Sequence, residues 1–221
     1  MSASLEAIER RNPEWRPWLA AIRDVLAEIE NPAWDAAVPR RLGTRDAAAP
    51  LLAGIGLCIE SGIESADLDR LRRKLAHCSP KAVAHLLPLP LLHACRRRFA
   101  DEMPEGWPRG YCPLCGAWPT LAEVCGVERA RHLRCAACGS AWRVHGLSCP
   151  YCGMNDHDKL GSLVPQQPGI NAVVEVCHGC HGYLKAFAEL RTAAPAQVML
   201  QDLASVELDL AAAERGYRRP A

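Results

Sequence analysis

Four Cys-x-x-Cys pairs lie within residues 112–180 of this 221-residue chain. They are Cys112/Cys115, Cys135/Cys138, Cys149/Cys152 and Cys177/Cys180. Pairs of this spacing form metal-binding knuckles, and two knuckles supply the four thiolates of one tetrahedral site. The intervals between successive pairs are 19, 10 and 24 residues. Pairing the first with the second and the third with the fourth gives each site a long interval that can hold a strand or two. The sequence therefore predicts two consecutive ribbon-like metal modules.

The residues around the cysteines favour metal over disulfide. A glycine follows the second cysteine in the first three pairs, and this position favours positive φ, which lets backbone N–H groups turn toward the sulfurs. In the fourth pair His181 takes this place and Gly182 follows it. His178 and His181 could replace a cysteine ligand, but we expect them beside the site or on the surface. The alternative, a thioredoxin-type redox dithiol, would be one such pair next to a βαβ pattern.

The elements that must position these knuckles change along the chain. Residues 1–104 indicate a helical bundle. Pro17 begins one helix, which ends before Asn31-Pro32, and further helices are expected over residues 47–61, after Ser65 and after Ser79-Pro80. The first helix should present one apolar face, formed by Trp18, Leu19, Ile22, Val25, Leu26 and Ile29.

After the Pro- and Gly-rich residues 102–110 the pattern changes to short strands, expected over residues 132–134, 141–147 and 171–176. Asp202 should then cap a C-terminal helix that closes near Gly216. The predicted fold class is α+β: a helical domain (1–104), two tandem zinc-ribbon-like four-cysteine modules (105–148 and 149–190) and a C-terminal helical tail (191–221).

Charge and composition exclude several functions. The formal net charge is +1, and residues 105–190 hold seven basic and seven acidic side chains, whereas a nucleic-acid ribbon usually carries a basic surplus. Arg129, Arg131 and Arg134 form the only candidate patch, which we interpret as a solvated face. Twelve cysteines with no signal peptide indicate a reducing compartment. The longest apolar run, residues 47–59, is too short and broken to span a membrane, so we expect a cytoplasmic protein.

Other reactive side chains are assigned to ordinary packing. Cys58, Cys78, Cys95 and Cys125 are expected to be small buried hydrophobes. A row of histidines eight residues apart lacks a carboxylate to complete a site; its members are His77, His85 and His93. Trp142 should pack over the first metal site. No nucleophile–base pair, phosphate loop or paired carboxylates are found, which predicts a protein that is not an enzyme and has no small-molecule substrate.

The knuckle region resembles one family in particular. CPLCG (112–116), LRCAACG (133–139) with Trp142, SCPYCG (148–153) and CHGCHGYLKAF (177–187) occur in that order and are followed by DLASVELDLAAAERGY (202–217). This succession resembles the formate dehydrogenase accessory protein family, FdhE, over roughly the C-terminal half of the chain. The YLK continuation of the fourth knuckle and the DLASVELD segment are its most specific parts. Two features depart from the family: a shorter N-terminal helical region, and His181 in place of a small residue.

The resemblance implies a helical part on a rubredoxin-like double ribbon, with metal, favoured to be iron with zinc as the alternative, held by all eight knuckle cysteines. It also implies a cytoplasmic maturation factor that binds the catalytic subunit of respiratory formate dehydrogenase before export and does not turn over a substrate. Four thiolates suit iron or zinc equally. Two alternative functions stay open: a rubredoxin-like electron carrier, and a zinc-ribbon module that binds nucleic acid or the ribosome. Self-association is left open as well.

Overall fold

The computed structural model describes residues 2–38, 66–165 and 171–220. The chain divides into two compact units, Met1–Pro104 and Glu105–Ala221. The expected helix over residues 47–61, its Cys58 and the Ser65 cap lie outside the described residues. Each unit is considered separately below.

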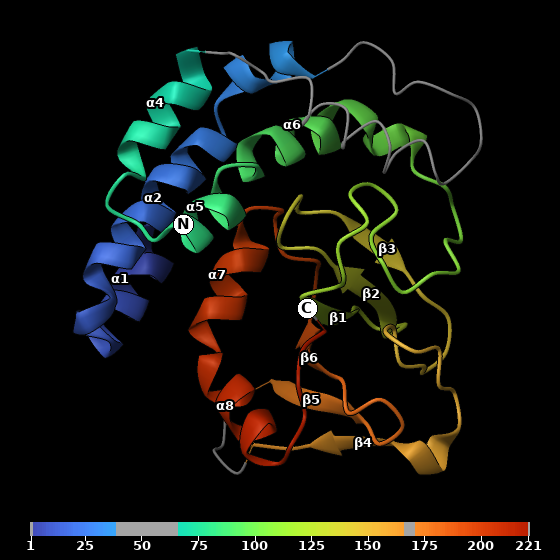
Figure 1. Cartoon of the computed structure of the whole chain (residues 1–221). Helices are drawn as coiled ribbons and strands as arrows, with labels where there is room; N and C mark the ends of the chain where they lie inside the picture. The colour runs from blue at the N-terminus through green and yellow to red at the C-terminus, as the bar shows by residue number, and fades with distance from the viewer. Residues whose placement is uncertain (1, 39–65, 166–170, 221) are drawn as a thin grey trace. The chain divides into compact units, whose positions relative to one another are not determined.

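Unit 1 is helical. Its helix α2 packs against α1, α4 and α6 (Figure 1). The helices are α1 (Ser2–Arg11), α2 (Arg16–Ile29), α4 (Ala66–Lys74), α5 (Pro80–Leu86) and α6 (Leu89–Phe99), with short 3₁₀ turns η1 (Pro13–Trp15), η2 (Pro32–Ala37) and η3 (Ala100–Glu102). Pro17 lies in the first turn of α2, and the Ser79 side chain accepts a hydrogen bond from the Ala82 N–H at the start of α5, as helix caps do.

The apolar face of α2 is confirmed for five of the six residues expected on it. Leu19, Ile22, Val25, Leu26 and Ile29 are each at most 2% exposed. Trp18 was wrongly placed on this face. It is 36% exposed and meets the Trp15 ring edge-to-face, with 6.2 Å between the ring centroids.

A buried carboxylate joins three elements of unit 1. Glu28 of α2 is 5% exposed and accepts hydrogen bonds from Arg70 and Lys74 of α4 and from the Trp34 ring of η2. Burial raises the pKa of Glu28, but these hydrogen bonds together lower it to about 2. The ionised form is therefore favoured by the folded state.

Acid should consequently weaken unit 1. Because the pKa of Glu28 falls from an ordinary 4.5 to about 2 on folding, its contribution is complete above pH 4.5 and is lost as the pH falls toward 2. The loss amounts to about 3 kcal/mol. Urea unfolding at pH 6 and pH 3 should show a smaller pH effect for Glu28→Gln than for the parent chain. An equal pH effect in both chains would assign the acid sensitivity to other groups.

Unit 2 is built on one six-stranded sheet of order β3-β2-β1-β6-β5-β4. The strands are β1 (Leu121–Cys125), β2 (Ala130–Arg134), β3 (Ala141–Arg143), β4 (Leu160–Leu163), β5 (Ala172–Cys177) and β6 (Tyr183–Glu189), with a 3₁₀ turn η4 (His157–Lys159) before β4. Strands β1–β3 form one antiparallel ribbon and β4–β6 form a second. The two ribbons repeat the same succession of knuckle, two strands, knuckle and strand.

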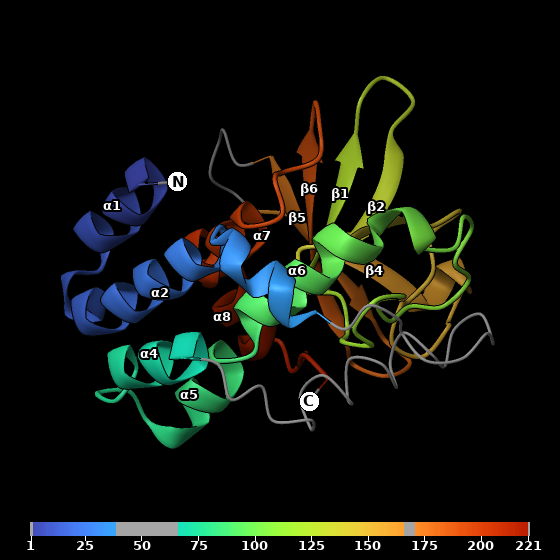
Figure 2. The ribbon, with the colours of Figure 1, turned by 90° about the horizontal axis from the view of Figure 1, so that it is seen from above.

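The central pair, β1 and β6, joins the two ribbons. These strands run parallel, with Leu121 opposite Lys185 and Cys125 opposite Glu189 (Figure 2). The last strand of the second ribbon thus lies against the first strand of the first ribbon. A single continuous sheet therefore carries all four knuckles.

Two C-terminal helices cover one face of the sheet, where a single helix was expected (Figure 1). They are α7 (Gln197–Ala204) and α8 (Val206–Glu214). Val198 of α7 and Leu208 of α8 pack with Val174 of β5 and Phe187 of β6. Asp202 is not the N-cap that was expected: it lies inside α7, whose N-cap is Ala196, and its carboxylate pairs with basic groups described below.

The strand expected over residues 141–147 ends at Arg143. Val144 still donates a hydrogen bond to the Arg131 carbonyl, but Gly146 then adopts a φ of +75° and turns the chain toward the third knuckle. Among the described residues, none of the helices combines the length and apolar character needed to cross a membrane.

Candidate metal centres

The four knuckles adopt one common turn. In each, the first cysteine carbonyl accepts from the residue four places on, which is Gly116, Gly139, Gly153 or His181. These residues have φ between +56° and +76°, as expected for the three glycines. In each knuckle the N–H of the first cysteine also donates to the carbonyl five places on. His181 therefore keeps the turn of the other knuckles, although a side chain at positive φ is strained.

The knuckles meet in the pairs that the intervals predicted. Cys112, Cys115, Cys135 and Cys138 form one group and Cys149, Cys152, Cys177 and Cys180 form the other, with all sulfurs of a group within 4.8 Å of one another.

The sulfur spacing suits a tetrahedral ion. The closest contacts between knuckles are 3.6 and 3.4 Å in the first group and 3.6 and 3.7 Å in the second. These are far beyond the ~2.05 Å of a disulfide. A tetrahedral ion with bonds of ~2.3 Å to sulfur holds its ligands roughly 3.8 Å apart. Each group could therefore hold one metal ion.

The first group is deeply buried. Cys112, Cys135 and Cys138 are each 0% exposed, and Cys115 is half-buried. Burial raises the pKa of Cys112, but hydrogen bonds from the other three thiols hold it well below its usual value. The pKa of Cys135 is raised well above its usual value, first by the Cys112 sulfur. The Cys112 thiolate is thus favoured while Cys135 stays protonated. Ionising all four thiols requires a cation among them.

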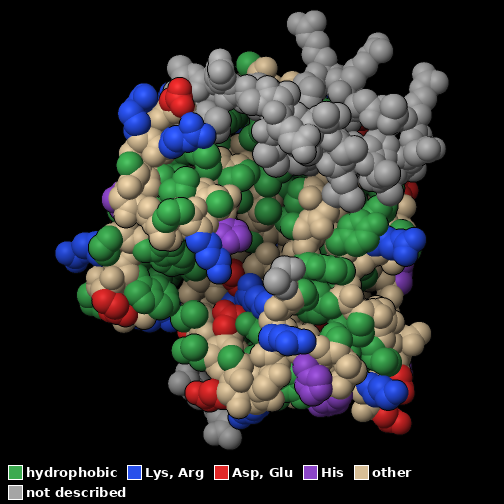
Figure 3. Space-filling model, viewed as in Figure 1, with side chains coloured by type: hydrophobic (Ala, Val, Ile, Leu, Met, Phe, Trp, Pro, Cys, Tyr) green, Lys and Arg blue, Asp and Glu red, His purple; other side chains and the backbone are tan. Residues whose placement is uncertain are grey.

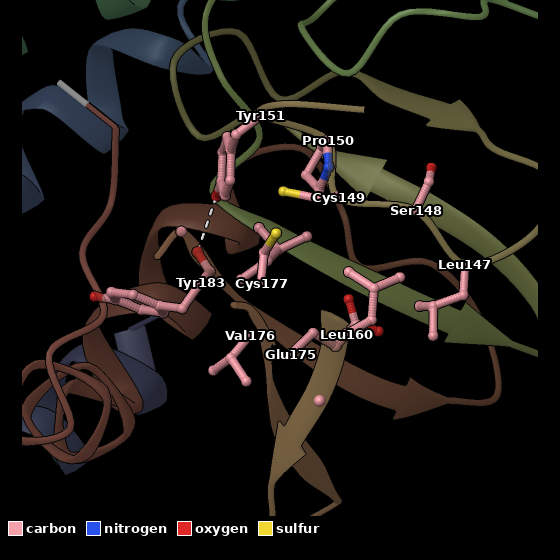
Figure 4. Close-up of a pocket in the computed structure, with 13 residues that line it drawn as sticks. Leu147, Ser148, Cys149, Pro150, Tyr151, Leu160, Glu175, Val176, Cys177 and Tyr183 are labelled. Carbon is pink, nitrogen blue, oxygen red and sulfur yellow. Dashed lines mark hydrogen bonds between the residues drawn. The ribbon is translucent and has the colours of Figure 1, made fainter. Parts of the chain in front are cut away.

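The second group is more open. Cys149 and Cys177 are buried, but Cys180 is half-buried and Cys152 is exposed. Below the knuckles lies an apolar cavity of about 20 Å³, whose lining includes Leu160 (Figure 4).

Backbone N–H groups lower the pKa of the first cysteine in the first and third knuckles, as expected, and also in the fourth, which lacks the glycine. Those of Tyr151 and Cys152 lower the pKa of Cys149, but burial outweighs them and raises it. For Cys177 the balance reverses: burial raises the pKa, and the N–H groups of Cys180 and Gly179 bring it below its usual value.

A metal ion in the second group should be released before one in the first. An exposed ligand such as Cys152 can be reached by a competing chelator, whereas three of the four sulfurs in the first group are sealed. When a colorimetric chelator is added to the loaded protein, we expect two phases of metal release. The ion of the second group should be released several-fold faster than the ion of the first. A Cys149→Ser variant should lack the fast phase. A single rate for both ions would contradict this order.

The histidines near the fourth knuckle lie outside the cysteine groups, as expected. His178 and His181 are both exposed. The His178 Nδ1 is 2.9 Å from the Tyr217 hydroxyl, and the His181 ring lies 6.1 Å from the Tyr217 ring. Both therefore contact the C-terminal segment.

Tyr151 connects the two ribbons. This residue lies between the cysteines of the third knuckle, and its hydroxyl donates to the Tyr183 carbonyl at 3.0 Å and to the Pro119 carbonyl at 3.4 Å (Figure 4). Its ring also meets Trp118 edge-to-face, with 5.6 Å between the centroids. The third knuckle is thereby fixed to the first ribbon as well as to its own.

The remaining cysteines and histidines belong to no such group within the described residues. Cys95 and Cys125 are buried as expected, whereas Cys78 is only half-buried. His93 is buried, and His77 and His85 are exposed. Trp142, expected over the first site, is buried in β3 opposite Leu133.

The arginine cluster was wrongly interpreted as a solvated face. Arg134 is 1% exposed and pairs with the fully buried Glu123, while Arg131 pairs with Glu175 through both of its terminal nitrogens. Only Arg129 is exposed. In Figure 3 the described residues show basic and acidic side chains side by side within each unit.

A buried ionic cluster was missed by sequence reasoning. Lys185 of β6 is 0% exposed, and its ammonium lies 2.7 Å from Asp202 and 2.8 Å from Asp209. Arg219 pairs with the same two carboxylates, and the Tyr183 hydroxyl donates to Asp209 at 2.8 Å. The cluster ties the strand after the fourth knuckle to α7, α8 and the C-terminal segment. All of its members except Arg219 come from the YLK and DLASVELD segments, and the resemblance of these segments was the only signal for it.

Known proteins resemble the chain in sequence and fold. Residues 133–221 match the FdhE C-terminal domain. The FdhE homolog of Aquifex aeolicus is 31% identical over 170 residues, which cover 76% of this chain and 55% of that protein. The FdhE protein of Escherichia coli O127:H6 is 32% identical over 116 residues, covering 52% of this chain and 37% of that protein. The chain thus spans about half the length of the first relative and less of the second.

A solved structure shares the fold. The crystal structure of the FdhE protein from Pseudomonas aeruginosa superposes with a TM-score of 0.56 and 22% identity, covering 98% of this chain and 90% of that one. Together with the two four-cysteine groups, the matched domain and the sequence identity to these relatives show that the C-terminal part of the chain, residues 133–221, belongs to the FdhE family.

Proposed function

We propose that this protein is a non-enzymatic accessory factor that binds the catalytic subunit of a respiratory formate dehydrogenase in the cytoplasm and supports its assembly or activation before export. The observation that carries the proposal is the coincidence of two complete four-cysteine groups with the FdhE C-terminal domain match over residues 133–221.

The eight knuckle cysteines are the proposed ligands of two metal ions. Their spacing and burial fit a tetrahedral four-thiolate ion, and iron is favoured over zinc by the family resemblance. Bound iron would supply a one-electron redox change, whereas zinc would only stabilise the fold. Anaerobic purification followed by metal analysis and visible absorption spectroscopy distinguishes them, because four-thiolate iron is coloured and zinc is not.

Affinity capture tests the partner. The tagged chain, expressed in its own cells under anaerobic growth, should recover a formate dehydrogenase catalytic subunit identified by mass spectrometry. Capture should be lost when Cys112 or Cys149 is replaced by serine. A reductase in place of the dehydrogenase would favour the electron-carrier alternative, and salt-sensitive recovery of ribosomes or nucleic acid would favour the ribbon alternative. The internal ion pairs of Arg131 and Arg134 speak against the latter.

A further inference from the structure

A pocket of about 570 Å³ lies in unit 2 beside the second cysteine group. Its wall comes from the segment before the first knuckle, from the end of β3 and from the third knuckle, including the exposed Cys152. This volume falls within the range of sites that take a small molecule or a few side chains. Neither metal binding by the cysteines nor the packing of the sheet requires a pocket at this place.

The pocket is lined by aromatic rings. Trp107, Tyr111, Trp118 and Tyr151 form a chain of edge-to-face contacts, with successive centroids 5.5, 6.3 and 5.6 Å apart. Tyr111 directly precedes the first knuckle, and Tyr151 lies within the third. The wall thus offers ring edges and faces for apolar groups next to both cysteine groups.

The segment that forms this wall is fixed in place. The Trp107 ring N–H donates to the Tyr111 carbonyl at 2.8 Å. Gly110 lies so close to the third knuckle that an added Cβ would be 1.7 Å from the Pro150 carbonyl oxygen, so no side chain fits there. The pocket is therefore formed before any ligand arrives, and a ligand need not order it.

The charged side chains of the pocket are all basic. Arg109, Arg131, Arg143 and His145 line it, and no aspartate or glutamate does. Arg131 is neutralised by Glu175. Arg109 and Arg143 are exposed and have no ion pair with any carboxylate of the described residues. These two guanidinium groups, which lie beside aromatic rings, can therefore bind an anionic group of a ligand.

We propose that this pocket binds an acidic segment of the protein partner, with its carboxylates at Arg109 and Arg143 and an apolar side chain against the rings of Tyr111 and Trp118. Guanidinium groups also bind phosphate, so phosphate is tested as a competitor below; the aromatic rings beside the two arginines favour a peptide that carries an apolar side chain. Tyrosine, tryptophan and arginine are also the residue types that dominate binding energy in protein interfaces.

Only the identity of the partner rests on the proposed function, because the pocket's preference for an acidic peptide can be measured alone. A fluorescein-labelled peptide with glutamate and aspartate around one phenylalanine is titrated into the purified, metal-loaded chain, and fluorescence anisotropy is recorded. Arg109→Glu and Arg143→Glu should each weaken binding at least about tenfold, since a charge-assisted hydrogen bond becomes a repulsion. Trp118→Ala should weaken binding several-fold.

Arg191→Glu is the matched control, because Arg191 is exposed and lies outside the pocket lining. It should bind like the parent chain, and all variants should keep their metal content. Three results would each overturn the acidic-segment site. A peptide with lysine in place of glutamate could bind as tightly as the acidic one, or Arg191→Glu could weaken binding as much as the pocket variants do. Inorganic phosphate or a single-stranded oligonucleotide could also displace the acidic peptide completely. Peptide binding that persists while capture of the dehydrogenase fails would place the error in the proposed function.

Discussion

Cys112→Ser is expected to lower the metal content from two ions per chain to about one and to leave most of the chain insoluble. Serine cannot replace a thiolate ligand, and Cys112 lies fully buried between Cys115 and Cys138. Structural four-ligand sites of this kind contribute on the order of 10 kcal/mol to folding in small zinc domains. Losing such a site exceeds the whole stability of an ordinary domain. Metal analysis of the soluble fraction and its yield relative to the parent chain measure both effects.

Cys125→Ser separates the loss of a ligand from the loss of a buried thiol. Cys125 is buried at the end of β1 and belongs to neither cysteine group. Its replacement by serine should cost only about 1–3 kcal/mol, the penalty of a poorly paired buried hydroxyl, and should leave both ions bound. Soluble Cys112→Ser protein with two ions and normal yield would contradict the assignment of Cys112 as a ligand.

The pairing of the knuckles could be predicted because it depends on local rules. The four pairs have equal spacing, and three of them carry a glycine at the positive-φ position. With two long intervals between pairs, there is one arrangement in which each site closes on its own hairpin. The apolar face of α2 was predictable for the same reason, since helical spacing is a local property. The fourth knuckle shows the limit of the rule, because His181 takes a conformation that sequence preference assigns to glycine.

What the sequence did not indicate depends on contacts between distant residues. Strand β6 was not predicted, because Lys185 is charged and yet faces inward between Tyr183 and Phe187. The Asp202 and Asp209 carboxylates, 17 and 24 residues away along the chain, and two backbone carbonyls of the same region make that burial tolerable. The parallel pairing of β1 with β6 likewise has no local signature. Arg134 resembled a surface residue for the same reason, because its partner Glu123 lies on the neighbouring strand.

Lys185→Met is expected to lower the free energy of unfolding of unit 2 by about 3–5 kcal/mol, the cost of removing one partner from a buried ion pair. Methionine fills a similar volume but leaves Asp202 and Asp209 with Arg219 as their remaining cation. Burial raises the pKa of Asp202, and Arg219 and Lys185 together bring it below its usual value, so the carboxylate is held ionised by these partners. Urea unfolding at neutral pH, followed by tryptophan fluorescence, measures the difference.

Lys159→Met is the matched control, because its ammonium is 4.0 Å from Asp156 and both side chains are about half exposed. An exposed pair of this kind contributes at most about 1 kcal/mol. Adding Asp209→Asn to Lys185→Met should recover part of the loss, because Arg219 then balances the single carboxylate of Asp202. Equal stability of Lys185→Met and the parent chain would mean that Arg219 alone satisfies both carboxylates. In that case the charged residues of the YLK and DLASVELD segments would serve to bind a partner and not to stabilise the fold.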